Sequence, residues 1–91
     1  MNLNSTISIS NSIFSEKVDN ETIILDTKTN QYFNLSDFGK LIWDMLIDEK
    51  QVYEIYQELV EFTDVKPDQL ENDILNFINS LEKLSLLEIT N

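Results

Sequence analysis

Cysteine and histidine are both absent from the sequence. Without cysteine the chain can form no disulfide, no thiolate metal site and no thiol nucleophile. Without histidine it lacks the commonest general base and the commonest zinc ligand, and a Ser–His–Asp triad is excluded. Catalysis would have to use Asp, Glu, Lys or Tyr, and 17 acidic residues among 91 make chance pairs of carboxylates common. We therefore expect no enzymatic activity, no metal and no cofactor.

Basic residues are also scarce: six Lys and Arg stand against 17 Asp and Glu, and the net charge is −11. Nucleic acids and anionic membranes bind proteins through clustered positive charge, so neither is an expected partner. The acidic excess has two interpretations. It keeps a small domain soluble, or it complements a basic peptide or protein surface.

Long apolar runs, glycine and proline are few as well. Residues 1–6 lack the basic start and apolar stretch of a signal peptide, and no run approaches the roughly 20 apolar residues of a membrane span. A cytoplasmic location is therefore expected. With one glycine and one proline the chain has no linker character. We expect an N-terminal arm over residues 1–12, with extended structure as an option, and a single domain over residues 13–91.

The first part of the sequence favours strands. The apolar and β-branched segments cover residues 5–10, 13–18, 22–25 and 31–35. The polar loop over residues 26–30 joins the last two segments into a hairpin. Asn30 is expected to take the left-handed backbone conformation at the end of this loop.

From Ser36 onward, apolar residues recur every three or four positions, which is typical of helices. We expect a helix capped by Ser36 that ends before residue 48, and two more helices over residues 51–62 and 67–84. Gly39 indicates a close approach of another backbone. The apolar tail over residues 86–89 is expected to pack back or to form a short strand. The residues assigned to the core of the helices are Trp43, Leu70, Phe77 and Leu81.

This order of elements predicts an α+β fold, winged-helix-like, with a small three-stranded antiparallel sheet followed by three helices. Such a fold is compatible with a transcription regulator or a protein-only adaptor subunit, because fold alone does not fix function. The second and third helices carry no cluster of Lys or Arg, which argues against DNA binding.

An ordered set of short segments resembles the PqqD-like family. Members are also called RiPP recognition elements, where RiPP means a ribosomally made and post-translationally modified peptide. The segments are Ile23-Ile24-Leu25-Asp26, Tyr32-Phe33-Asn34-Leu35, Ile42-Trp43 and residues 81–87, and the resemblance covers residues 13–88. The chain departs from the family pattern in having Asn30, Lys66 and Ser85 where Gly, Asp and Gly are usual.

The resemblance implies a non-catalytic role in natural product biosynthesis. In the family, the leader segment of a precursor peptide adds as an antiparallel strand to the edge of the three-stranded sheet. It lies in the cleft between that edge and the third helix. The implied partners are this leader peptide and a peptide-modifying enzyme such as a radical enzyme, a leader peptidase or a cyclase. At 91 residues, the chain would be a stand-alone member.

For this chain we predict that the open edge is the strand over residues 31–35 and that the third helix faces it. The predicted peptide-binding residues are Gln31, Tyr32, Phe33, Asn34, Leu35, Glu71, Ile74, Leu75, Ile78 and Glu82. Leu75 lies off the main apolar stripe and would floor a pocket, while Glu71 and Glu82 predict a basic residue in the leader. The alternative is that the following four residues belong to the core: Tyr32, Phe33, Ile74 and Ile78.

Overall fold

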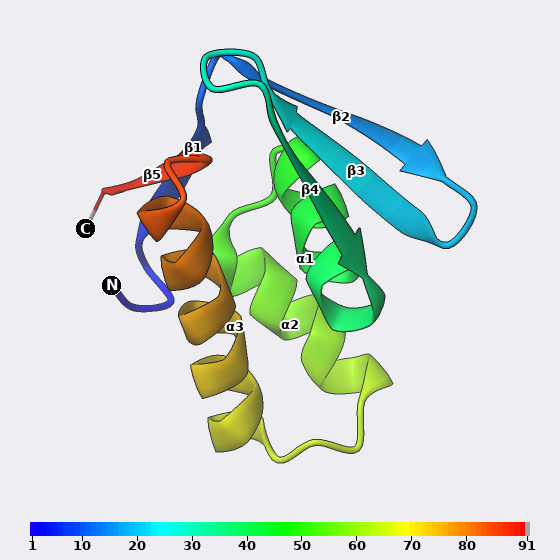
Figure 1. Cartoon of the computed structure of the whole chain (residues 1–91). Helices are drawn as coiled ribbons and strands as arrows, with labels where there is room; N and C mark the ends of the chain where they lie inside the picture. Colours follow the sequence, from blue (N-terminus) through cyan, green and yellow to red (C-terminus); the bar gives the residue numbers. More distant parts are fainter. Residues whose placement is uncertain (91) are drawn as a thin grey trace.

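Residues 1–90 are described by a computed structural model that contains two small sheets and three helices (Figure 1). The elements are β1 Thr6–Ile9, β2 Ile13–Val18, β3 Glu21–Asp26, β4 Gln31–Ser36, α1 Asp37–Ile47, α2 Val52–Phe62, α3 Pro67–Lys83 and β5 Leu87–Thr90. These positions confirm the predicted strands and helices and the winged-helix-like α+β arrangement.

The larger sheet is antiparallel with the strand order β2-β3-β4. In its register Ile24 lies opposite Phe33 and Leu25 lies opposite Tyr32. Figure 1 shows β4 running into α1, with β2 lying farther from the helices. Asn30 closes the β3–β4 loop with a φ of 58°, which confirms the left-handed backbone expected there.

The two ends of the described chain pair with each other. β1 and β5 form a two-stranded antiparallel ribbon in which Ile7 lies opposite Ile89. Ile7 is buried, so the predicted arm over residues 1–12 contributes to the core through β1. The short strand that the apolar tail could form is present as β5. Residue 91, the last of the predicted domain, lies outside the described residues.

One core lies between the inner face of the larger sheet and the three helices. Trp43, Leu70 and Leu81 are buried as predicted, and Phe77 is partly buried against them. The sheet contributes Ile24, which has no exposed surface. The other buried apolar residues are Ile7, Ile42, Leu46, Val52, Ile55, Leu59, Ile74, Ile78, Leu86 and Leu87.

The helix starts are stabilised in different ways. At α2, Gln51 and Glu54 form a capping box, and the Gln51 side chain also accepts the Ile7 N–H at 2.8 Å. Pro67 begins α3, where its missing N–H is not required. Ser36 immediately precedes α1, as predicted, and its backbone is extended, but its side chain makes no capping hydrogen bond.

The connector between α1 and α2 is fixed by an ion pair. Lys50 Nζ donates a hydrogen bond to Glu58 Oε1 on the second turn of α2. This hydrogen bond raises the pKa of Lys50 above its ordinary value. Both side chains are partly exposed, so solvent screens the pair and it contributes little to the free energy of unfolding. Its main effect is to hold the connector against α2.

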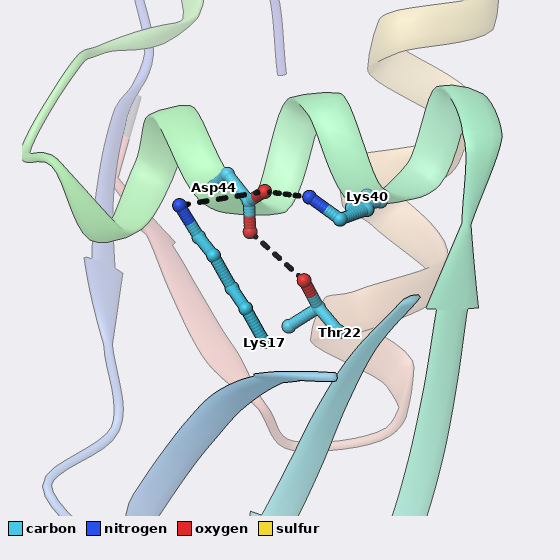
Figure 2. Close-up of polar contacts among 4 residues, drawn as sticks. All are labelled: Lys17, Thr22, Lys40 and Asp44. Carbon is cyan, nitrogen blue, oxygen red and sulfur yellow. Dashed lines mark hydrogen bonds and ion pairs between the residues drawn. The ribbon is translucent and has the colours of Figure 1, made fainter. Parts of the chain in front are cut away.

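Asp44 connects the larger sheet to α1. Its Oδ1 accepts a hydrogen bond from the buried Thr22 hydroxyl of β3 at 3.0 Å. Its Oδ2 accepts one from Lys40 at 2.7 Å, and Lys17 Nζ of β2 lies 3.9 Å away. Figure 2 shows these three side chains converging on the one carboxylate. Two strands are therefore tied to the same turn of α1.

We expect Asp44→Ala to lower the free energy of unfolding by about 1–3 kcal/mol, because it leaves the buried Thr22 hydroxyl without its acceptor. Urea denaturation followed by circular dichroism measures this change. Asp64→Ala, in the exposed α2–α3 connector, is the matched control and should change stability by less than about 0.5 kcal/mol. Equal stabilities of the two variants would contradict the role assigned to Asp44.

Candidate functional site

The larger sheet has an open edge at β4. The strand order β2-β3-β4 places β3 on one side of β4 and no described strand on the other. An open edge carries main-chain N–H and C=O groups that can pair with another strand. The predicted edge over residues 31–35 is therefore an edge strand of the described structure.

The pairing pattern determines which main-chain groups face the open side. Thr27 N–H donates to Ser12 O at 2.9 Å, just before β2 pairs with β3. In an antiparallel pair, successive residues direct their main-chain groups alternately to one neighbour and then to the other. Leu25 and Ile23 lie two and four residues before Thr27, so their main-chain groups also face β2. The main-chain groups of Ile24, which lies between Leu25 and Ile23, face β4.

The same alternation continues into β4. Phe33 lies opposite Ile24 and Leu35 lies opposite Thr22, so both residues bond inward to β3. Tyr32 and Asn34 consequently direct their N–H and C=O groups to the open side. These two residues are the main-chain docking points of the edge.

The side chains of β4 lie on two faces. Phe33 and Leu35 share the inner face with Ile24 and are partly buried. Tyr32 and Asn34 lie on the outer face, and Tyr32 is 69% exposed. Tyr32 is therefore not a core residue, whereas Phe33 packs against the core.

Phe77 of α3 reaches the point where β4 passes into α1. A Cβ atom on Gly39 would lie 3.1 Å from the Phe77 ring and 3.7 Å from Leu35 Cδ2. The expectation that another backbone approaches Gly39 is therefore wrong, because the close neighbour is an aromatic ring. A larger residue at 39 would have to displace this ring by a few tenths of an ångström.

The predicted helix residues occupy different parts of α3. Ile74 and Ile78 are fully buried and form the middle of its inward face. With successive residues about 100° apart around the helix, Glu71, Leu75 and Glu82 lie to one side of this face, whereas Phe77 lies to the other. The Phe77 ring lies near Gly39 and Leu35, at the junction of β4 and α1.

Glu82 lines a hollow together with Asp26, Lys28 and Thr29 at the β3–β4 loop. Its Oε2 accepts the N–H of Ile89 at 3.3 Å, so the side chain is directed to β5. Leu75 is partly buried against the core. Sequence reasoning assigned Phe77 to the core alone, and its position on the hydrophobic stripe gave no signal that it also borders β4. Peptide contacts by Glu71, Leu75 and Glu82 stay predictions.

A polar hollow of about 510 Å³ lies between the β3–β4 loop, the end of α3 and β5, and Glu82 is among its lining residues. Asp26 at its wall is buried, and its Oδ1 accepts the Lys28 N–H at 3.0 Å and the Ser12 hydroxyl at 3.2 Å. These bonds brace the loop. Within residues 1–90 no three acidic side chains gather closely enough to hold a metal ion. No helix in the same range is long and apolar enough to cross a membrane.

We expect amide exchange to reveal the alternation along β4. The N–H groups of Tyr32 and Asn34 face the open side and should exchange quickly with deuterium, whereas those of Phe33 and Leu35 bond to β3 and should be protected. Residue-resolved NMR exchange on the free protein measures this difference. Protection of Tyr32 and Asn34 instead would mean that the register is shifted or that the edge is covered.

Known proteins resemble the chain in sequence and in fold. The family model described as Coenzyme PQQ synthesis protein D (PqqD) matches residues 21–87. The solved structure of TbiB1 in complex with the TbiA(beta) leader peptide is 31% identical, with a TM-score of 0.85, and the match covers 89% of this chain and 94% of that one.

A second solved structure is lasso peptide synthetase B1 complexed with the leader peptide. It is 23% identical, with a TM-score of 0.82, and the match covers 90% of this chain and 96% of that one. At this identity the likeness concerns the fold alone. No curated protein matches the chain. The family match spans most of the sequence, and the chain belongs to the PqqD family.

Proposed function

We propose that this chain is a non-catalytic domain that binds the leader segment of a ribosomally made precursor peptide and delivers it to a peptide-modifying enzyme. The observation that carries the proposal is the open edge of β4, with the Phe77 ring near Leu35 at the end of that strand. TbiB1, which is similar over 89% of this chain, was solved in complex with a leader peptide, and this supports the proposal.

The leader binds by adding a strand to β4. The N–H and C=O groups of Tyr32 and Asn34 pair with the peptide backbone, which supplies affinity that depends little on sequence. We propose an antiparallel orientation, because it allows the better-aligned hydrogen bonds. The N-terminal part of the leader then lies near Ser36, and its C-terminal part leaves near Gln31.

Specificity comes from the side chains that alternate along the added strand. One set points to the inner face, where Phe33, Leu35 and Phe77 provide an apolar surface. The other set points outward beside Tyr32. Ile74 and Ile78 are fully buried, and we propose that they support this surface from below without touching the peptide.

The energetics favour a releasable complex. A disordered leader loses conformational entropy when it becomes a strand, and this loss offsets part of the gain from main-chain bonds and apolar contact. The edge itself is held in place by the sheet and the helices, so the protein contributes little further ordering cost. Moderate affinity suits a domain that must pass its peptide to an enzyme.

The rival functions have less support. An enzyme would need a built site, and the chain has neither Cys nor His to supply the common nucleophile or base. A winged-helix regulator would need a basic surface, and the net charge is −11. We place the protein in the cytoplasm, where precursor peptides are made, without nucleic-acid or membrane partners.

The first test blocks the edge without removing a side chain that the fold needs. Asn34→Pro deletes an outward N–H and should abolish binding of the leader encoded beside this gene, while the fold persists because proline is tolerated on edge strands. Asn34→Thr keeps the N–H and should bind like the wild type. Fluorescence anisotropy with labelled leader measures both, and unchanged affinity of Asn34→Pro would refute strand addition at β4.

A second test separates the two sides of α3. Ser80→Arg introduces a bulky side chain on the helix one turn beyond Phe77, and should weaken leader binding by about tenfold or more. Leu75→Arg places the same charge on the other side of α3, where the sequence predicts a leader contact, and should weaken binding as well. Circular dichroism verifies that both variants fold. Unchanged affinity of Leu75→Arg would refute the predicted contact at Leu75, and unchanged affinity of Ser80→Arg would refute a contact beside Phe77.

A further inference from the structure

A second apolar surface lies just beyond the end of β4. Its floor is formed by the buried Leu59 and Leu70, and its walls include apolar side chains of α1, α2 and the α2–α3 connector. We call it the helical hollow, and its volume is about 590 Å³. The lining residues are Asp37, Phe38, Leu41, Leu59, Phe62, Thr63, Val65, Leu70 and Asp73.

Large apolar side chains in the walls of the helical hollow are exposed to solvent. Phe62 is 83% exposed, Leu41 is 49% exposed and Val65 is 37% exposed. Apolar side chains gathered around a concave surface are the usual form of a binding pocket, whereas single exposed ones are common.

The rim of the helical hollow is acidic. Asp37 stands at the start of α1 and Asp73 stands on α3, and neither forms an ion pair with any residue in the range 1–90. No Lys contributes to the lining. An occupant that buries an apolar group here and places a positive charge beside it would match both features.

The helical hollow continues directly from the proposed peptide edge. Ser36 is the last residue of β4, and Asp37 and Phe38 follow it into the hollow. A strand advances about 3.4 Å per residue, so a peptide that pairs with β4 reaches the hollow within a few residues of passing Ser36. For an antiparallel peptide, this is its N-terminal flank.

We infer that the helical hollow holds an apolar side chain from the N-terminal flank of the leader, next to a Lys or Arg that meets Asp37 and Asp73. The inference rests on the proposed function, since it extends the same peptide beyond β4. A second copy of this chain is a poorer occupant, because two molecules of charge −11 repel each other. The modifying enzyme could also cover this surface, but continuity with β4 favours the leader.

The test uses the leader of the precursor encoded beside this gene, labelled for fluorescence anisotropy. Phe62→Ala should weaken binding by about tenfold, because it removes a wall of the hollow. Phe62 is mostly exposed, so the variant should fold. Tyr53→Ala removes another exposed aromatic residue from α2, outside the hollow, and should leave the affinity unchanged.

Charge and peptide length provide independent controls. Asp73→Asn should weaken binding a few-fold at low salt, whereas Asp68→Asn, on the same helix but outside the hollow, should not. A truncated leader without its N-terminal flank should bind the wild-type protein weakly. Its affinity should equal that of the full leader for the Phe62→Ala variant. The two losses should not add, because both remove the same contact.

The outcomes separate the two proposals. Failure of the wild type to bind the leader would overturn the proposed function and this inference together. Binding by the wild type that Phe62→Ala leaves unchanged would overturn only the inference. If that variant instead lost affinity for the modifying enzyme, or lost self-association in sedimentation, the helical hollow would be a docking site for another protein.

Discussion

The antiparallel pairing of β3 with β4 is the constraint on which the rest of the structure depends. It places Phe33 and Leu35 on the inner face and turns the main-chain groups of Tyr32 and Asn34 to the open side. A shift of one residue would exchange the two sets, exposing the apolar side chains and turning the other main-chain groups outward. The register is therefore fixed by the same burial that stabilises the core.

Two tertiary contacts hold this edge in position against the helices. Asp44 connects β3 and β2 to α1. Because Gly39 has no side chain, the Phe77 ring has room to lie near Leu35. Both contacts combine residues that are distant in sequence. A rigid edge with a defined apolar border lowers the entropy lost on binding, which makes these contacts part of the proposed function as well as of the fold.

The sequence predicted the fold well because its elements carry local signals. The β-branched run at β3, Pro67 at the start of α3 and the helical periodicity after Ser36 each specify local structure. The border of the site was less predictable. The position of Phe77 near Leu35 depends on how α3 is rotated in the assembled core, and neither propensity nor spacing contains that information.

The central claim is that the leader pairs with β4. Hydrogen-bond scalar couplings between the ¹⁵N amides of the protein and the ¹³C carbonyls of a labelled leader would test it most directly by NMR. The account predicts such couplings at Tyr32 and Asn34 and none at Ser15 or Lys17, whose main-chain groups face outward at the opposite edge, β2. Couplings at β2, or binding with none at β4, would contradict it.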